Sequence, residues 1–308
     1  MKRIGADQVR AFYKGKRKVT KRKAPRLDPE EWTLTNTPQG LGDCVILTEH
    51  FRACSQEGKP SSAYSPAPLW PSLVKSCPWA VNLDHPRQVS LCHASNNWDL
   101  GPGHMVDRAR RLFGFDPQIQ PCGALSVPFV RRQKSRVALH FESGFHSIWQ
   151  RSNLHPRARQ LYAHHRKTLR DFMTEMGDRF TWIEFGNRRV IDHERADDAT
   201  GRPLEETIPL MAECEYHLGL VSGPMHLAAA LGLKVITVLN FPDPRELMLP
   251  NLVDLGVVEQ EWLYPQAVHL HQDIDSPHWP LFSKQSLARA FGGDVYPYWS
   301  TDTLVALR

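Results

Sequence analysis

The chain has 308 residues, of which 41% are hydrophobic and 23% are charged. No apolar stretch approaches the roughly 18 residues that a membrane-spanning helix needs, which excludes an integral membrane protein with helical spans, and no apolar segment follows the basic N-terminus as in a secretory signal. We therefore expect a cytoplasmic protein, and the length favours two domains of about 130–150 residues each.

Positive charge is concentrated at the start of the chain. The net charge is +5, but residues 1–26 contain eleven Lys and Arg against one acid, so they carry +10 and the remainder carries −5. Seven of the ten residues Lys14–Lys23 are basic, and their mutual repulsion predicts a flexible tail over 1–26. Two interpretations stay open: a solvated tail, and a tail that attracts a polyanion such as nucleic acid or an anionic lipid surface.

The first predicted domain covers residues 27–133. It begins with a β-rich run at Trp32–Thr37, which meets a glycine turn at Pro38–Asp43 and then a helical pattern over Cys44–Ser55. The order is strand, turn, helix. Further along we expect a loop over 60–80, a helix over His104–Phe113 and irregular chain over 114–136, which contains the domain boundary.

The second predicted domain covers residues 134–308 and alternates strands with helices. Before its central motif it is expected to contain a strand at Arg136–Phe141, a helix over Pro156–Met176, a strand at Phe180–Gly186 and a helix over Leu204–Glu213. Terminal helices are expected at Ser286–Phe291 and Thr301–Arg308. Alternation of this kind in both halves predicts parallel sheets with ligands at the carboxyl ends of the strands.

The most informative motif of the chain runs from Tyr216 to Asn240. An apolar strand ends in Ser222-Gly223-Pro224, an alanine-rich helix follows and stops at Gly232, and a β-branched strand resumes at Lys234. Pro224 suits the first helical position and Ser222 or Gly223 suits the cap. The free N–H groups of this helix would then open at a strand's carboxyl end and form an anion site.

Neither a metal site nor a disulfide is predicted. His269 and His271 would lie on one face of a strand, and Asp273 and Asp275 form a D-x-D pattern, but neither pair has a third ligand at a suitable spacing. The six cysteines form no C-x-x-C pair, so reduced thiols without a chemical role explain them. They are Cys44, Cys54, Cys77, Cys92, Cys122 and Cys214.

Two blocks, Gly40-Leu41-Gly42-Asp43 and Ser222–Ala230, resemble the ADP-heptose:lipopolysaccharide heptosyltransferase family, glycosyltransferase family nine. A weaker third block, His140–Trp149, falls where that family holds the donor's phosphates. The resemblance implies an α/β GT-B fold, in which two Rossmann-like domains face each other across a cleft. The acceptor would lie on the N-terminal domain and the nucleotide-sugar on the C-terminal domain.

The resemblance also implies roles for single residues. Asp43 would be the catalytic base, because inverting transfer needs a carboxylate to take the proton of the attacking hydroxyl. The acceptor-side turn would comprise Gly40, Leu41 and Gly42, and the donor would be held by Ser143, Ser222, Gly223, Pro224, Met225 and His226. The alternatives are that Asp43 only caps a helix and that the second turn is a tight turn with a packing histidine.

Two positions depart from the family pattern. Val221 stands where heptosyltransferases usually have an aspartate that contacts the donor sugar, and Ser147 stands where a phosphate-binding lysine is common. Arg151 could supply the charge of that lysine. We therefore expect a sugar donor other than ADP-heptose.

Taken together, these features predict a cytoplasmic, inverting, heptosyltransferase-like enzyme. It would move a hexose, pentose or heptose from a nucleotide-sugar to a hydroxyl acceptor, with no metal or other cofactor. The expected partners are the nucleotide-sugar and a polyanionic acceptor, either lipopolysaccharide core at the inner membrane surface, with peripheral membrane contact, or nucleic acid. One alternative is a DNA-modifying glycosyltransferase acting on a hydroxymethylated base, and a second is a non-catalytic nucleotide-binding protein of the same fold.

Overall fold

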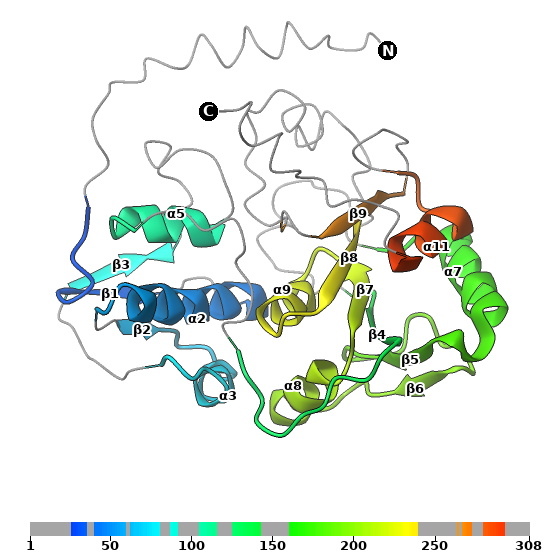
Figure 1. Cartoon of the computed structure of the whole chain (residues 1–308), viewed down its shortest axis with the longest axis horizontal. Coiled ribbons are helices and arrows are strands. Elements are labelled where there is room, and N and C mark those ends of the chain that lie inside the picture. The colour runs from blue at the N-terminus through cyan, green and yellow to red at the C-terminus, as the bar shows by residue number, and fades with distance from the viewer. Residues whose placement is uncertain are drawn as a thin grey trace, which may run out of the picture.

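The structure is a computed structural model that describes two parallel β-sheets with helices around them (Figure 1). It describes residues 26–35, 40–59, 62–80, 87–91, 105–115, 125–142, 160–239, 264, 267–272 and 280–292. The predicted tail therefore lies almost wholly outside the described residues. No helix within these ranges is long and apolar enough to cross a membrane.

The first sheet has three parallel strands in the order β2-β1-β3. Its strands are β1 (Trp32–Thr35), β2 (Ser62–Tyr64) and β3 (Arg87–Ser90), and its helices are α2 (Leu41–Gln56), α3 (Trp70–Lys75) and α5 (Met105–Leu112). Parallel strands need a crossover connection, and α2 supplies it between β1 and β2. The helices α2 and α5 confirm the two helical patterns predicted for this half.

The loop predicted over 60–80 is wrong, because β2 and α3 lie inside it, and β3 had no prediction. These strands have three and four residues, too few to show a hydrophobic period. Tertiary pairing defines them: Leu34 in the middle strand lies between Ala63 and Val89. A buried hydrogen bond from the Thr33 hydroxyl to the Ser62 hydroxyl, at 2.9 Å, also joins β1 to β2.

The second sheet has six parallel strands in the order β6-β5-β4-β7-β8-β9. They are β4 (Arg136–His140), β5 (Thr181–Glu184), β6 (Ala196–Asp198), β7 (Tyr216–Leu220), β8 (Lys234–Leu239) and β9 (Val268–His271). The strand order reverses between β4 and β7, since β5 and β6 continue on one side and β8 and β9 on the other. Ligands of open parallel sheets bind at such a switch point.

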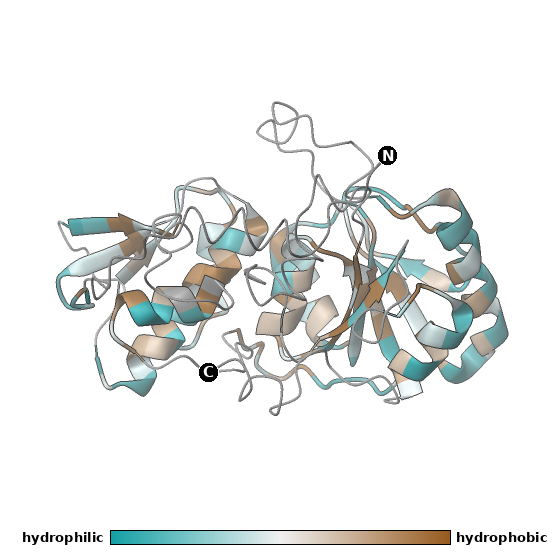
Figure 2. Cartoon of the chain, turned by 90° about the horizontal axis from the view of Figure 1, so that it is seen from above, coloured by the Kyte–Doolittle hydropathy of each residue, from teal (hydrophilic) through white to brown (hydrophobic). Residues whose placement is uncertain are grey.

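Helices cover both faces of this sheet, and Figure 2 shows its hydrophobic strands enclosed between them. The helices α7 (Ala163–Met176) and α11 (Lys284–Gly292) pack on one face, while α8 (Leu204–Ala212) and α9 (Gly223–Ala230) pack on the other. The predicted helix over 156–176 starts later than expected. Tyr162 is extended and its N–H donates to Gln272 Oε1 at 2.9 Å, so the helix begins at Ala163.

The two sheets are joined through α2 and α9, which lie side by side in Figure 1. One continuous cluster of buried side chains contains Leu34 of the first sheet together with Ala138 and Val235 of the second. The buried alanines Ala228–Ala230 let the two helices approach closely. The halves therefore share a hydrophobic core on this side of the larger sheet.

The linker between the two sheets is fastened to the C-terminal end of α9. The Arg132 guanidinium donates to the carbonyl oxygens of Leu231 at 2.8 Å and Gly232 at 2.9 Å, and the Leu125 N–H donates to that of Ala230 at 3.2 Å. Carbonyls at a helix end lack intrahelical partners and favour cations. Gly232, at φ +76°, ends the helix as predicted.

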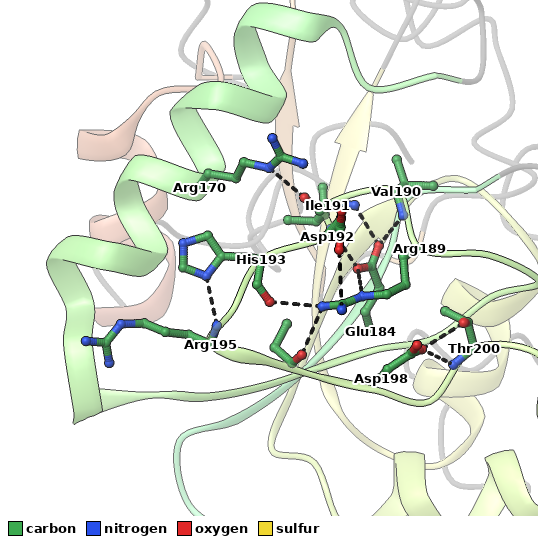
Figure 3. Close-up of polar contacts among 11 residues, drawn as sticks. Arg170, Glu184, Arg189, Val190, Ile191, Asp192, His193, Arg195, Asp198 and Thr200 are labelled. Atoms are coloured by element: carbon green, nitrogen blue, oxygen red, sulfur yellow. Dashed lines mark hydrogen bonds and ion pairs between the residues drawn. The ribbon is translucent and has the colours of Figure 1, made fainter.

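The connection between β5 and β6 is organised around one buried carboxylate (Figure 3). Glu184 accepts backbone N–H groups from Val190 at 2.6 Å, Ile191 at 2.7 Å and Asp192 at 3.1 Å, and the Arg189 guanidinium lies 3.7 Å away. A buried charge is tolerated only with such partners. Glu184 thus fixes the loop that follows β5, at the edge of the sheet where the carboxyl ends of β4 and β5 lie.

Replacing Glu184 by Gln should lower the free energy of unfolding by about 2–4 kcal/mol, because an amide accepts at one atom only and aims its N–H₂ at backbone donors. Chemical denaturation measures this change. The matched control is Asp198→Asn, at an exposed carboxylate in the same region whose hydrogen bonds within the described residues come from Thr200. Equal stability of Glu184→Gln and wild type would contradict the role of Glu184.

Candidate functional site

The glycine turn of the first half forms the start of α2. Gly40 is the N-cap residue, with φ −74° and ψ 152°, and Asp43 is the acid in the first turn. Asp43 is half-buried, and its Oδ2 lies 2.9 Å from where a Cβ on Gly40 would stand, so the carboxylate folds back toward the cap. The positive end of the helix dipole favours an ionised carboxylate there.

The second turn forms the start of α9, as its sequence predicts. Ser222 is the N-cap residue with an extended backbone, Gly223 is the first helical residue, and Pro224 is the second rather than the first. The N–H groups of Met225 and His226 both point to the Ser222 carbonyl, at 3.1 Å and 3.4 Å. Pro224 has no N–H, and the N–H groups of Ser222 and Gly223 have no acceptor among the described residues. The predicted anion site can therefore draw on these two N–H groups.

The structure brings the two turns into direct contact. A Cβ on Gly42 would lie 2.6 Å from Cδ2 of His226, and a Cβ on Gly223 would lie 2.7 Å from Cβ of Leu41 and 3.1 Å from the Gly42 nitrogen. Only glycine permits this approach. The two blocks that carry the family resemblance thus form one site at the ends of α2 and α9.

His226 lies inside this contact rather than on an open surface. Its side chain is 4% exposed, its Nδ1 lies 2.9 Å from the Tyr264 hydroxyl, and its Cδ2–Nε2 edge faces Gly42. Tyr264 therefore fixes the orientation of the ring. It lies outside every motif of the sequence, which gave no signal for this role.

Ser222 connects α9 to the sheet below it. Its Oγ lies 3.2 Å from Nδ1 of His140 and 3.1 Å from the Leu220 carbonyl oxygen. Burial lowers the pKa of His140 to about 4 and that of the neighbouring His217 to about 3, because the charged imidazole is desolvated. Both rings are therefore neutral at pH 7.

Met225 and Val221 contribute apolar surface rather than polar contacts. The resemblance places Met225 among the donor-binding residues, but its side chain is 0% exposed and its sulfur accepts a hydrogen bond from the Thr237 hydroxyl at 3.3 Å. The Met225 side chain thus belongs to the core. Val221 is half-buried and packs against the same core. Ser143, Ser147 and Arg151 lie outside the described residues.

The carboxyl ends of β4 and β5 carry a second polar group beside His140. Glu142 accepts the Asn187 N–H at 2.6 Å, and the exposed Arg188 guanidinium lies 3.5 Å from it. Gly186, at φ +134°, passes close to Glu142 and His140, with a would-be Cβ at 3.1 Å and 3.6 Å. The loop built on Glu184 therefore adjoins the switch point of the sheet.

The cysteines of the described chain are buried free thiols. Burial raises the pKa of Cys77 to about 11 and that of Cys214 to about 12, so both are protonated at pH 7. His269 and His271 are buried on one face of β9, and no group of three potential metal ligands occurs in the described ranges. Cys92, Cys122, Asp273 and Asp275 lie outside those ranges.

No protein-family model matches this chain, and no curated protein is similar to it in sequence. Several solved structures do share its fold. The chain is similar to the heptosyltransferase WaaC of E. coli, solved with ADP, at 11% identity and a TM-score of 0.55, over 86% of this chain and 99% of WaaC. It is also similar to a family 9 glycosyl transferase of Veillonella parvula DSM 2008, at 11% identity and a TM-score of 0.53, over 88% of this chain and 99% of that one.

A third similar structure is the dodecameric, iron-containing glycosyltransferase TibC of enterotoxigenic E. coli H10407. Identity is 15% and the TM-score is 0.50, over 72% of this chain and 61% of TibC, so the chain spans less than two thirds of TibC. At these identities the likeness concerns the fold. The chain has the α/β fold of the GT-B heptosyltransferases, with parallel sheets, which confirms the predicted fold class and resemblance.

Substituting either glycine at the contact should force the two turns apart. For Gly42→Ala and Gly223→Ala we expect a loss of about 1–3 kcal/mol in the free energy of unfolding, typical of overpacking in a close contact. Urea denaturation measures it, with Ser55→Ala near the exposed end of α2 as the control. Two alanine variants as stable as the control would show that the turns do not touch.

Proposed function

We propose that this protein is a glycosyltransferase that moves a sugar from a nucleoside-diphosphate sugar to a hydroxyl acceptor with inversion at the anomeric carbon. The observation that carries the proposal is the contact between the two turns, where Gly42 meets His226. It brings the helix start that carries Asp43 against the helix start that we propose binds the diphosphate of the donor. The fold shared with WaaC and the Veillonella glycosyl transferase supports the same class of reaction.

The proposed chemistry is a single displacement. The carboxylate of Asp43 takes the proton of the acceptor hydroxyl while that oxygen bonds to the anomeric carbon, and the bond from this carbon to the diphosphate oxygen breaks. The electron pair of that bond leaves with the nucleoside diphosphate. The Ser222 hydroxyl, the Gly223 N–H and the His226 ring would stabilise the leaving charge. None of these steps requires a bound metal ion.

The donor is proposed to be a nucleotide-sugar other than ADP-heptose, because the Val221 side chain cannot accept hydrogen bonds from sugar hydroxyls. WaaC, whose fold the chain shares, is solved with ADP, so ADP is the first nucleotide to test. For the acceptor we propose a polyanion that attracts the eleven Lys and Arg of residues 1–26, with lipopolysaccharide core at the membrane surface preferred. No comparison supports modification of DNA.

Changing Asp43 to Asn should lower the transfer rate by about 10²–10⁴-fold, since the amide cannot accept a proton. Binding of the nucleoside diphosphate should change little, because the amide has the same shape. Donor turnover and calorimetric binding measure the two effects.

The control is Glu57→Gln, at the opposite end of α2. It should turn over at the wild-type rate. Wild-type turnover of a correctly folded Asp43→Asn variant would overturn the base assignment. Nucleotide binding without any turnover of sugar donors by the wild-type protein would favour the non-catalytic alternative.

A panel of ADP-, GDP-, UDP- and CMP-linked sugars should show a preference for a donor other than ADP-heptose. A missing charged hydrogen bond costs about 1.5–3 kcal/mol, roughly one to two decades of affinity. The reciprocal variant Val221→Asp should shift the preference toward ADP-heptose. Thermal shifts and turnover report both, and ADP-heptose as the best wild-type substrate would contradict the inference from Val221.

A further inference from the structure

We infer that His140 is a positioning residue for the donor, which donates a hydrogen bond from Nδ1–H to the Ser222 hydroxyl and thereby leaves the hydroxyl proton free to turn toward a diphosphate oxygen. This inference rests on the proposed function and deepens it. His140 lies below the donor turn and would act through the Ser222 hydroxyl rather than by touching the ligand.

His140 and Ser222 occupy the two sides of the switch point. His140 is the last residue of β4 and pairs with Gly219 of β7, and Ser222 follows β7. Their contact, at 3.2 Å, therefore crosses between the strands where the order of the sheet reverses. Ligands of such sheets bind above this crevice, so a side chain that connects its two sides can control the group above it.

One glycine on the neighbouring strand β7 and one in the loop after β5 leave space for this arrangement. A Cβ on Gly219 would lie 2.3 Å from the His140 carbonyl oxygen and 3.0 Å from Cε1 of His217. On the other side, a Cβ on Gly186 would lie 3.6 Å from Cδ2 of His140. Any larger residue at position 219 would collide with the backbone of His140. Gly219 is therefore required for the position that His140 has in β4.

The hydrogen bonds of Ser222 determine which imidazole nitrogen carries the proton. The Ser222 hydroxyl does not cap α9, and its two neighbours are His140 Nδ1 and the Leu220 carbonyl oxygen at 3.1 Å. A carbonyl only accepts, so the single hydroxyl proton goes to Leu220 and the bond from His140 must be donated by Nδ1–H. Both contacts are satisfied in this arrangement alone.

A neutral His140 suits this role. Burial lowers its pKa to about 4, so one ring nitrogen carries a proton at pH 7. The ring of His217, equally neutral, has no hydrogen-bond partner on either nitrogen among the described residues. It therefore does not compete for the Ser222 hydroxyl, and His140 remains the one histidine that orients it.

The consequence appears when an anion binds. A diphosphate oxygen beside the Gly223 N–H can replace the Leu220 carbonyl as the acceptor of the hydrogen bond from the Ser222 hydroxyl. Nδ1–H of His140 still donates to Oγ in that arrangement. A hydroxyl that accepts one hydrogen bond becomes a stronger donor in the next. Without His140, the Ser222 hydroxyl could equally turn a lone pair of Oγ, rather than its proton, toward the phosphate.

The test uses ADP as the probe and calorimetry on the full chain. His140→Phe removes the N–H but keeps a ring, and it should weaken ADP binding about 5- to 30-fold. His140→Asn restores a donor and should recover most of that loss. In a Ser222→Ala background, His140→Phe should weaken binding by no more than about twofold, because the effect passes through Ser222.

The inference fails if His140→Phe binds ADP like wild type or if its effect adds fully to that of Ser222→Ala. Nitrogen-15 NMR of the ligand-free wild type gives an independent answer, since a His140 ring protonated at Nε2 rather than Nδ1 would overturn the inference whether or not ADP binds. His140→Asn identifies the His140 signals. If ADP, GDP and UDP all fail to bind while Nδ1 is protonated, the proposed function fails and the hydrogen-bond assignment stands.

Discussion

The close approach of two helix starts is the constraint on which the rest of this structure depends. Gly42 and Gly223 have no side chains, so the beginnings of α2 and α9 touch through backbone and through the edge of His226. The shared core, with the buried alanines of α9, holds the helices at this distance. Two positive helix ends thus converge on one point, where they favour an anion and an ionised Asp43 together.

The groups that contact Ser222 at the described floor of this site are neutral, whereas the charged pair Glu142 and Arg188 follows β4 and β5. Burial keeps His140 and His217 uncharged, with pKa values of about 4 and 3, and the described donors around them are a hydroxyl, a backbone N–H and an imidazole. Such dipoles are held in place before a ligand arrives, so they lose little energy in reorganising around developing charge. The charged carboxylate of Glu184 is instead enclosed by backbone N–H groups away from Asp43.

The two turns and the fold class could be predicted because glycine, proline and alanine patterns act locally. The contact between the turns could not, since Gly42 and His226 are distant in sequence and meet only through packing. Tyr264 and Glu184 also escaped prediction, because their partners are a distant ring and backbone N–H groups that leave no pattern. Strands as short as β2 had no period to detect, and the side chain of Met225 showed its place only once the sheet was assembled.

The attachment of the linker gives α9 a mechanical role. Arg132 and Leu125 bind the carbonyls at one end of this helix, and Gly223 meets Leu41 at its other end. A helix of eight residues is about 12 Å long and stiff. The linker holds one end of α9 and the start of α2 meets its other end, so the position of the turn at Ser222 is set from both halves of the chain at once.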